Sequence, residues 1–178
     1  MVDGNTKLSR NWVLWYHAKD NNDWSMRSYQ KIAVIRNVKD FWTVMNSIGT
    51  IVHDMYFMMV EGVDPIYESH RHTRGGAWLF KVHKSVTDNI WFRLCELLVC
   101  EQIADQSSHI TGISVSPKHS YVTIRIWNDD ITIREKGLTF SDYPIKNIDL
   151  DIGYIYQAHD PKQNDLKRYM YRHPKAMQ

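Results

Sequence analysis

The segment DPIYESHRHTRGGAWLF, residues 64–80, contains the features around which the fold and the function of the chain are organised. It places an aromatic residue beside a carboxylate, Tyr67-Glu68, and continues through a cationic run to the double glycine Gly75-Gly76. Its proline ends any preceding element, and its glycines permit backbone conformations that other residues resist, so the segment predicts a loop leading into a strand. A flat ring beside a carboxylate suits a planar ligand that carries adjacent N–H donors.

Length and composition indicate one folded domain. A chain of 178 residues is long enough for one well-packed core, and two domains would both be small. We therefore expect a single domain over residues 1–178, with flexible ends at about 1–9 and 161–178. Aromatic residues make up 12% of the chain, an excess that must fill a core, line a site or face a partner.

Charge and cysteine content exclude several classes of protein. The net charge of +2 is too small for bulk attraction to nucleic acid or membranes. No run approaches the roughly 20 apolar residues of a membrane span, and the polar N-terminal segment is no signal peptide. The cysteines Cys95 and Cys100 are five positions apart in one predicted helix, which does not favour a disulfide, so we expect both to be reduced thiols. We expect a cytoplasmic protein, with a nuclear pool also compatible, and no membrane association.

The hydrophobic pattern predicts more strands than helices. Asn37 is a good N-cap for a helix over 38–48, and Ser85 or Thr87 would cap a long helix reaching about residue 103. Strands are predicted at 11–17, 28–35, 55–60, 76–83, 111–117, 120–127 and 148–157. We therefore predict the α+β class, with a curved, cup-shaped antiparallel sheet and two to three helices packed on its convex face.

The long helix has two apolar stripes, although packing on a sheet needs only one. The first stripe contains Val86, Ile90, Leu94, Leu97 and Leu98, and the second contains Phe92, Cys95, Val99 and Ile103. Two interpretations remain open. Flanking segments could cover the second stripe, or it could form a partner groove on the helical face, away from the open side of the sheet.

Trp24 is a second candidate binding residue, because it lies in a polar loop with no alternating apolar neighbours. A loop tryptophan is more often a core plug, and the same holds for Tyr67. Together, however, Trp24 and Tyr67 allow two rings to face each other across one end of the sheet.

The order and spacing of these residues resemble the eukaryotic translation initiation factor 4E family, which binds the 5′ cap of messenger RNA. The resemblance covers roughly residues 10–160, and it depends on a series of short motifs rather than on any single one. In chain order these are W-x-L-W at 12–15, the loop Trp24, V-x-D-F-W at 38–42, G-x-x-P-x-aromatic-E at 62–68, R-G-G-x-W at 74–78, I-W at 90–91, I-x-I-W at 124–127 and Y-Q-x-H at 156–159.

The resemblance implies a site for 7-methylguanine, a flat purine with a delocalised positive charge. Trp24 and Tyr67 would sandwich the base through stacking and cation–π attraction. Glu68 would accept hydrogen bonds from the guanine N1–H and N2–H groups. Trp127 would lie close to the methyl group, and Gly75-Gly76 would pin the end of the Tyr67 loop.

The resemblance also implies cations for the triphosphate. Lys118 matches the first basic position of the last hairpin, and the next falls on Thr123, where the charge is lost. Arg125, two residues further along the same strand, would face the same side and is a substitute. From the C-terminal region, Lys162 and Lys167 are phosphate candidates, and His159 would help to position the triphosphate.

A partner-binding surface is implied on the helical face. Its expected residues are Val38, Trp42, Phe92, Arg93, Glu96 and Val99, where a scaffold subunit of the 4G type or a 4E-binding repressor would dock through a Y-x-x-x-x-L-φ helix. Arg93 and Glu96 replace the acidic and the apolar residue usual in the family. We therefore expect a partner helix that carries an acidic residue opposite Arg93.

Three functions are weighed on these residues. The first is a monomeric protein that binds capped messenger RNA, or a 7-methyl-GTP or dinucleotide cap analogue, and recruits it for translation or withholds it. The second is a cap-independent interaction module of the same fold, which the unusual Tyr67 and Thr123 keep open. The third is a cap-processing enzyme, for which only Asp149 and Asp151 suggest a carboxylate cluster. No catalytic motif or cofactor motif is present, and His70-x-His72 has no partners spaced for a metal, so we expect neither enzyme activity nor a bound metal or cofactor.

Overall fold

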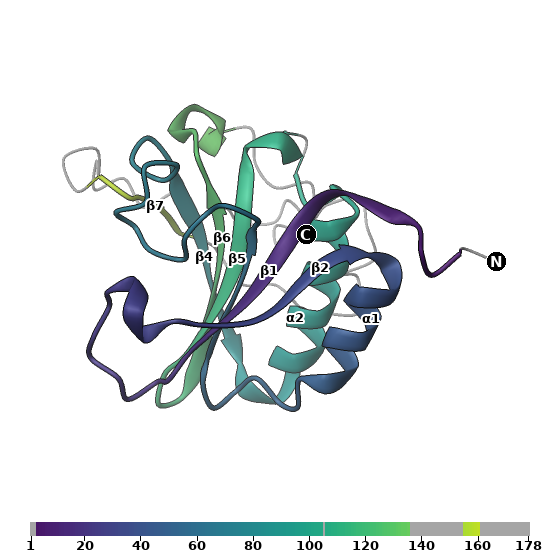
Figure 1. Cartoon of the computed structure of the whole chain (residues 1–178). Coiled ribbons are helices and arrows are strands. Elements are labelled where there is room, and N and C mark those ends of the chain that lie inside the picture. Colours follow the sequence, from purple (N-terminus) through teal and green to yellow (C-terminus); the bar gives the residue numbers. More distant parts are fainter. Residues whose placement is uncertain (1–2, 105, 136–154, 161–178) are drawn as a thin grey trace, which may run out of the picture.

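The computed structural model describes residues 3–104, 106–135 and 155–160, which form one curved antiparallel sheet of seven strands (Figure 1). The order of strands across the sheet is β2-β1-β3-β5-β6-β4-β7. The strands are β1 (Lys7–His17), β2 (Gln30–Asn37), β3 (Met55–Val60), β4 (Gly76–His83), β5 (Ile110–Pro117), β6 (Tyr121–Asn128) and β7 (Ile155–Ala158). The predicted fold class is confirmed.

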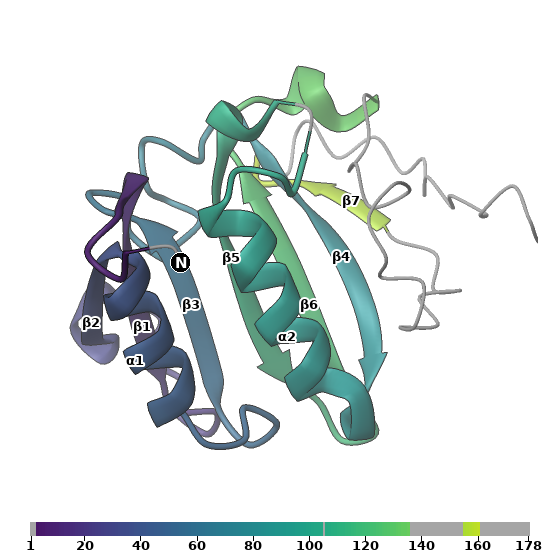
Figure 2. The same cartoon turned by 90° about the vertical axis from the view of Figure 1, so that its right-hand side faces the viewer.

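Two α-helices in the described ranges, α1 (Val38–Ser47) and α2 (Lys84–Val99), lie against one face of the sheet (Figure 2). Short 3-10 helices lie in the connections between strands, at Met26–Ser28, Ser107–His109 and Ile131–Glu135. Figure 2 shows α1 in front of β1 and β2, and α2 in front of β5 and β6, so neither α-helix of the described residues covers the opposite, concave face. No helix among the described residues is both long and apolar enough to cross a membrane.

Alternation along the strands separates the two faces, and β6 shows it without interruption. On β6, the aliphatic residues Val122, Ile124 and Ile126 are buried in the core beneath the helices, while Trp127 belongs to a separate cluster on the concave face. Successive side chains of a strand point to opposite faces, so Arg125 shares the concave face with Trp127. The helix-side core also contains three buried tryptophans, Trp12, Trp78 and Trp91.

The concave face has a smaller apolar cluster of its own, which lies under the loops rather than under a helix. Its buried members come from the β1–β2 connection, β3, the loop after β3 and β6: Tyr29, Met55, Phe57, Met59, Val63 and Trp127. This cluster gives the loops a firm base at one end of the cup.

The predicted start of α1 is confirmed, but that of α2 is wrong. Asn37 accepts a hydrogen bond from the Asp40 backbone N–H at 2.8 Å. At α2 the N-cap is His83, whose Nδ1 accepts from the Ser85 N–H at 3.3 Å and lies 2.7 Å from the Ser85 hydroxyl. A neutral imidazole nitrogen can accept the hydrogen bond as a hydroxyl would, so α2 begins before either predicted cap.

Helix α2 ends at Val99 rather than near residue 103. Glu101 takes φ 55°, in the left-handed region, and the Gln102 N–H donates to the Leu97 carbonyl at 2.8 Å. These bonds close the last turn and leave residue 103 outside the helix. Its second apolar stripe is largely covered within the fold, since Cys95, Val99 and Ile103 are buried and Phe92 stays partly accessible.

The N-terminal segment joins the sheet and bonds to the start of α1. Strand β1 begins at Lys7, and the backbone N–H groups of Val38 and Lys39 donate to the carbonyls of Thr6 and Gly4 at 3.0 and 2.8 Å. The end expected to be flexible over residues 1–9 therefore overlaps β1 and the segment bonded to the start of α1. The expected end at 161–178 and most of the predicted strand 148–157 lie outside the described residues.

Gly75 provides a test of the close packing where the loop enters β4. A Cβ on Gly75 would lie 1.9 Å from the Asn128 carbonyl oxygen, whereas a Cβ on Gly49 would meet no atom within 4 Å. We expect Gly75→Ala to lower the free energy of unfolding by about 2 kcal/mol or more, because backbone must move.

Gly49→Ala is the matched control, and it should leave stability unchanged or raise it by about 0.5 kcal/mol. Urea unfolding followed by tryptophan fluorescence measures both values. Equal effects of the two substitutions would contradict close packing at Gly75.

Candidate functional site

Trp127 forms the floor of the concave face. It pairs with Gly112 on β5 and Ala77 on β4, whose small size leaves room for the indole between the strands. The indole N–H donates to the Ser114 hydroxyl at 2.8 Å, and the side chain is 2% exposed. A buried indole with its N–H satisfied is a rigid base for other rings.

Tyr67 lies flat on this indole. The two ring centroids are 4.8 Å apart with an interplanar angle of 21°, and Tyr67 is 42% exposed. His72 and His159 also contact Trp127, each with its ring centroid at 5.0 Å. Trp127 is therefore covered, which differs from the direct ligand contact expected from the sequence, because the tyrosine ring occupies the space above the indole.

The loop that carries Tyr67-Glu68 is held by His72. The His72 Nδ1–H donates to the Ile66 carbonyl at 2.8 Å, which leaves Nε2 to accept from the Thr111 hydroxyl at 3.0 Å. Burial lowers the pKa of His72, in agreement with this neutral form. The loop is thus tied to β5 at one point, and Tyr67 lies directly beside that tie.

The double glycine closes the same loop. A Cβ on Gly76 would lie 2.4 Å from the Tyr156 hydroxyl, and Gly75 is packed against the Asn128 backbone. Only glycine allows the chain to pass this close to β6 and β7. The geometry supports the anchoring role expected for Gly75-Gly76.

His159 lies behind the aromatic rings rather than in the open. Its Nδ1–H donates to the His72 carbonyl at 3.1 Å, and its backbone N–H donates to the Gly75 carbonyl at 3.1 Å. Burial, followed by the neighbouring His72, lowers the pKa of His159 to about 4. At neutral pH it is uncharged, so it supports the rings and offers no cation to a phosphate.

Trp24 is exposed and has one face supported. Its ring stacks on the His17 imidazole at 4.7 Å with an interplanar angle of 4°, and the side chain is 52% exposed. His17 is itself buried and lies 2.9 Å through Nε2 from the carbonyl oxygen of Asp23, the neighbour of Trp24. The core-plug interpretation of Trp24 is therefore wrong.

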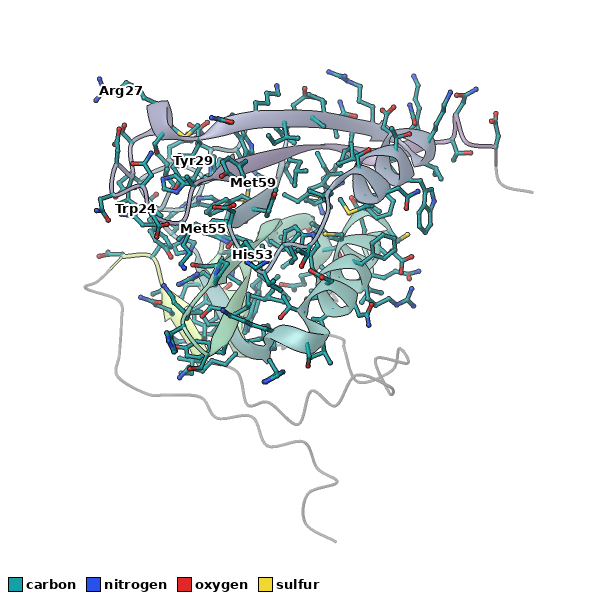
Figure 3. The ribbon with its side chains drawn as sticks, turned by 90° about the horizontal axis from the view of Figure 1, so that it is seen from below. Trp24, Arg27, Tyr29, His53, Met55 and Met59 are labelled. Carbon is teal, nitrogen blue, oxygen red and sulfur yellow. The ribbon has the colours of Figure 1, made fainter. Side chains whose placement is uncertain are left out.

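Tyr29 lies between the Trp24 and Tyr67 loops. Its ring is 4.6 Å from His17, and its pKa is raised to about 12 by burial, with Tyr67 and Glu68 adding to the shift. Figure 3 shows Trp24, Tyr29, Met55 and Met59 at this end of the molecule. The loops that carry Trp24 and Tyr67-Glu68 leave opposite ends of the sheet, since His17 pairs with Met55 and Trp12 with Val60. Tyr29 lies close to the support of the first loop and to the side chains of the second.

Sequence reasoning missed His17, Tyr29 and His72 as supporting residues of the site. For His17 a signal was available, because it lies two positions after Trp15 on β1 and so shares its face. For His72 and Tyr29 the local sequence carried no such signal, since each acts through contacts with distant segments.

The expected cations fall on one side of the sheet where they are described. Arg125 is on the concave face two residues before Trp127, and its buried Nε has no hydrogen-bond partner among the described residues. Lys118 is exposed in the β5–β6 turn, where its backbone N–H donates to the Tyr121 carbonyl at 2.8 Å. Lys162 and Lys167 lie outside the described residues. Within those residues, no group of three or more His, Cys, Asp or Glu side chains could hold a metal ion.

The helical face carries the expected partner surface in part. Trp42 is 43% exposed, and its ring lies 5.5 Å from Phe92, which joins α1 to α2. Val38 is half-buried and Val99 is buried. Arg93 forms an ion pair with Glu96 one turn along α2.

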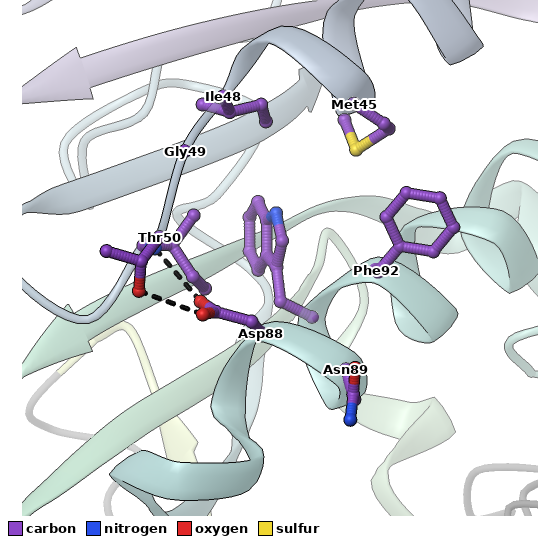
Figure 4. Close-up of a pocket in the computed structure, with 9 residues that line it drawn as sticks. Met45, Ile48, Gly49, Thr50, Asp88, Asn89 and Phe92 are labelled. Carbon is purple, nitrogen blue, oxygen red and sulfur yellow. Dashed lines mark hydrogen bonds between the residues drawn. The ribbon is translucent and has the colours of Figure 1, made fainter.

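A pocket of about 240 Å³ lies next to Phe92, between the end of α1 and the start of α2 (Figure 4). The Asp88 carboxylate accepts from the Thr50 hydroxyl at 2.8 Å and from the Ile51 N–H at 3.0 Å, which ties α2 to the loop after α1. These bonds stiffen the edge of the helical face.

Comparison with known proteins identifies the family. The sequence model described as Eukaryotic initiation factor 4E matches residues 7–172. The chain belongs to the eukaryotic initiation factor 4E family.

Related chains of this initiation factor family are divergent. Eukaryotic translation initiation factor 4E-3 of Caenorhabditis elegans is 27% identical over 136 residues, covering 70% of this chain and 54% of the relative. Factor 4E-1A of Danio rerio is 27% identical over 158 residues, covering 84% of this chain and 68% of the relative. The human factor 4E is 27% identical over 136 residues, covering 72% of this chain and 63% of the relative. The chain thus matches about one half to two thirds of the length of these relatives.

Solved structures of the initiation factor 4E family share the fold. A complex of C. elegans eIF4E-3 with the 4E-binding protein Mextli and a cap analog superposes with a TM-score of 0.75 at 23% identity, covering 93% of this chain and 98% of that one. A crystal structure of Ascaris suum eIF4E-3 with the m2,2,7G cap superposes with a TM-score of 0.73 at 24% identity, covering 88% of this chain and 93% of that one.

His159 makes the site sensitive to pH. The pKa of His159 is about 4 in the folded chain, and its ordinary value is about 6.5. Between these pH values the imidazole binds a proton in the unfolded chain but not in the folded chain. Stability is then lost as pH falls from about 6.5 to about 4, and His159→Gln should reduce this loss by on the order of 1–2 kcal/mol.

Guanidinium unfolding at pH 7.0 and pH 4.5 measures the difference for each protein. His53→Gln, which changes an exposed histidine outside the aromatic cluster (Figure 3), serves as the control. An unchanged pH dependence in His159→Gln would contradict the neutral, buried imidazole.

Proposed function

We propose that the chain binds the 7-methylguanosine 5′ cap of messenger RNA on its concave face and recruits it for translation initiation through a scaffold partner. The observation that carries this proposal is that two loops each present an exposed aromatic ring, and that one of these rings has a carboxylate beside it. One loop presents Trp24, supported from behind by His17, and the other presents Tyr67 with Glu68. Membership of the initiation factor 4E family supports the same function.

The proposed ligand suits the chemistry of these side chains. Methylation at N7 gives guanine a delocalised positive charge, and an electron-rich ring attracts that charge through its π face. Trp24 and Tyr67 are both large and accessible, and each stacking contact contributes about 1–3 kcal/mol by analogy with base stacking. Glu68 supplies two acceptor oxygens for the adjacent N1–H and N2–H donors.

Support behind the rings limits the entropy lost on binding. Trp24 rests on the buried His17, and the Tyr67 loop is tied to β5 through His72. Side chains that are already held lose less freedom when a ligand arrives, which strengthens binding. We propose that only the Tyr67 ring, on its held loop, turns from Trp127 onto the base, which leaves the fixed indole open to the methyl group.

The phosphates would follow the strands away from Trp127. Arg125 is the nearest cation along β6 on the concave face, and Lys118 lies beyond it in the turn. A guanidinium can contact two phosphate oxygens at once, whereas the ammonium of Lys118 acts as a point charge. No part of this arrangement requires a catalytic group, so we propose a binding protein and not an enzyme.

Glu68→Gln tests base recognition. The amide replaces one acceptor by a donor that faces the N–H groups of guanine, so affinity for 7-methyl-GTP should fall roughly 10- to 100-fold. Quenching of tryptophan fluorescence and retention on immobilised 7-methyl-GTP measure the loss, with unmethylated GTP as a weak competitor.

Asp20→Asn is the matched control, because it removes one exposed carboxylate from the loop that carries Trp24. It should bind as the unchanged chain does. Absence of retention for the unchanged chain would instead favour a cap-independent interaction module, and equal retention of Glu68→Gln would exclude the proposed role of Glu68.

The helical face is the proposed docking surface for the scaffold or repressor. The exposed Trp42 and the partly accessible Phe92 form its aromatic centre, on the opposite side of the sheet from Trp127. A large exposed aromatic centre of this kind is typical of binding hot spots. Whether capped RNA is recruited or withheld would depend on which protein occupies this surface.

Arg93→Glu tests the charge preference of the partner. In the folded chain Arg93 pairs with Glu96, and reversal of its charge would place two like charges on one helical turn. A Y-x-x-x-x-L-φ peptide with an acidic residue opposite Arg93 should bind roughly fivefold more weakly to Arg93→Glu, as isothermal titration would show.

Arg36→Glu reverses an exposed charge on β2 and serves as the control. Both variants should keep their affinity for 7-methyl-GTP, because the concave face is unchanged. If the peptide bound equally well to Arg93→Glu and to the unchanged chain, the proposed charge preference would be wrong.

A further inference from the structure

Lys81 is an exposed cation on the concave face that no motif identified. It lies on β4 four positions after Ala77, and alternation places the two side chains on the same face. Ala77 pairs with Trp127, so Lys81 and Trp127 share this face as well. Lys81 is exposed, unlike the core residues on either side of it.

Strand pairing arranges the concave face in rows that cross β5, β6 and β4. The first row is Gly112, Trp127 and Ala77, the second is Ser114, Arg125 and Leu79, and the third is Ser116, Thr123 and Lys81. Successive rows lie roughly 6–7 Å apart, since each is two residues further along the strands. The aromatic floor is thus followed by a guanidinium and then by two hydroxyls and an ammonium.

The third row is rich in hydrogen-bond donors and contains no acid. Thr123 lies directly between Ser116 and Lys81, and directly opposed residues have Cβ atoms about 4.5–5.5 Å apart. None of the positions in the three rows is Asp or Glu, so no carboxylate in them neutralises the cations. Such a strip attracts an anion that extends away from Trp127.

Tyr121 holds the Lys81 side chain in place. The ammonium nitrogen lies 5.1 Å from the centroid of the Tyr121 ring, which shares the concave face two residues before Thr123. A cation–π contact restrains the lysine but uses none of its three N–H donors in a hydrogen bond. The ammonium is therefore ordered and still able to bind an anion.

We propose that Lys81 is a further phosphate-binding residue beyond Arg125, and that it supplies from β4 the charge that is missing at Thr123, its cross-strand neighbour. This inference rests on the proposed function, because it takes the base to lie at the Trp127 end of the cup. The ligand class is a polyphosphate attached to a purine, with the phosphate nearest the base at Arg125 and the more distant phosphates at Lys81. Lys81 thereby favours ligands with longer phosphate chains.

Ligands that differ only in phosphate number test this role of Lys81. The unchanged chain should bind 7-methyl-GTP more tightly than 7-methyl-GMP in fluorescence titrations. Lys81→Met should weaken 7-methyl-GTP roughly two- to fivefold and leave 7-methyl-GMP unchanged. The salt dependence for 7-methyl-GTP should also decrease by about one phosphate contact, and Lys81→Arg should restore both values.

Lys39→Met removes an exposed lysine from α1, on the other side of the sheet, and should change neither affinity. Equal weakening of both ligands by Lys81→Met would assign the residue a structural role and overturn the proposed phosphate contact, as would an unchanged affinity for 7-methyl-GTP. If the unchanged chain bound neither ligand, the proposed function itself would fail. If it bound both equally, only the proposed role of Lys81 would fail.

Discussion

The packing of the Trp127 indole on the concave face is the interaction on which the rest of the site depends. The ring fits because Gly112 and Ala77 leave space beside it, and its N–H is satisfied by Ser114. Three further rings, from the loop before β4 and from the end of β7, rest on this indole. The buried Trp127 therefore positions both the loop before β4 and the end of β7. A residue larger than Gly112 or Ala77 beside the indole would displace all three rings.

The curved sheet separates the two proposed binding surfaces, one on each of its faces, and connects them through a shared layer of strands. Its convex side is filled by α1, α2 and three buried tryptophans, and its concave side carries the aromatic floor and the rows of donors. Adjacent residues of β6 serve opposite sides, so a change in the core beneath the helices is one residue away from the proposed ligand site. Such close packing gives the proposed RNA site and the proposed partner surface a shared, rigid support.

Much of the fold follows from short-range patterns. The short apolar segment at 55–60 predicted β3 over the same residues as observed, and β6 was predicted to within one residue. Asn37 indicated the start of α1 because its amide can satisfy a free N–H. The cap of α2 was missed because a histidine ring took the place of a hydroxyl, which no spacing rule indicates. The sequence could not predict the exposure of Trp24 either, because a loop residue has no periodic neighbours that indicate what it packs on. In the structure, the Trp24 ring stacks on His17.

The sequence by itself determined the fold class, the faces on which Arg125 and Trp127 lie, and the residues offered by the two loops. These follow from alternation, turn residues and motif order, all of which act over a few positions. Only the tertiary structure decided that Tyr67 covers Trp127, that His159 is buried and neutral, and that Lys81 lies beside Thr123. Each of these depends on strand order and burial, which bring together residues up to 87 positions apart and which no local pattern encodes.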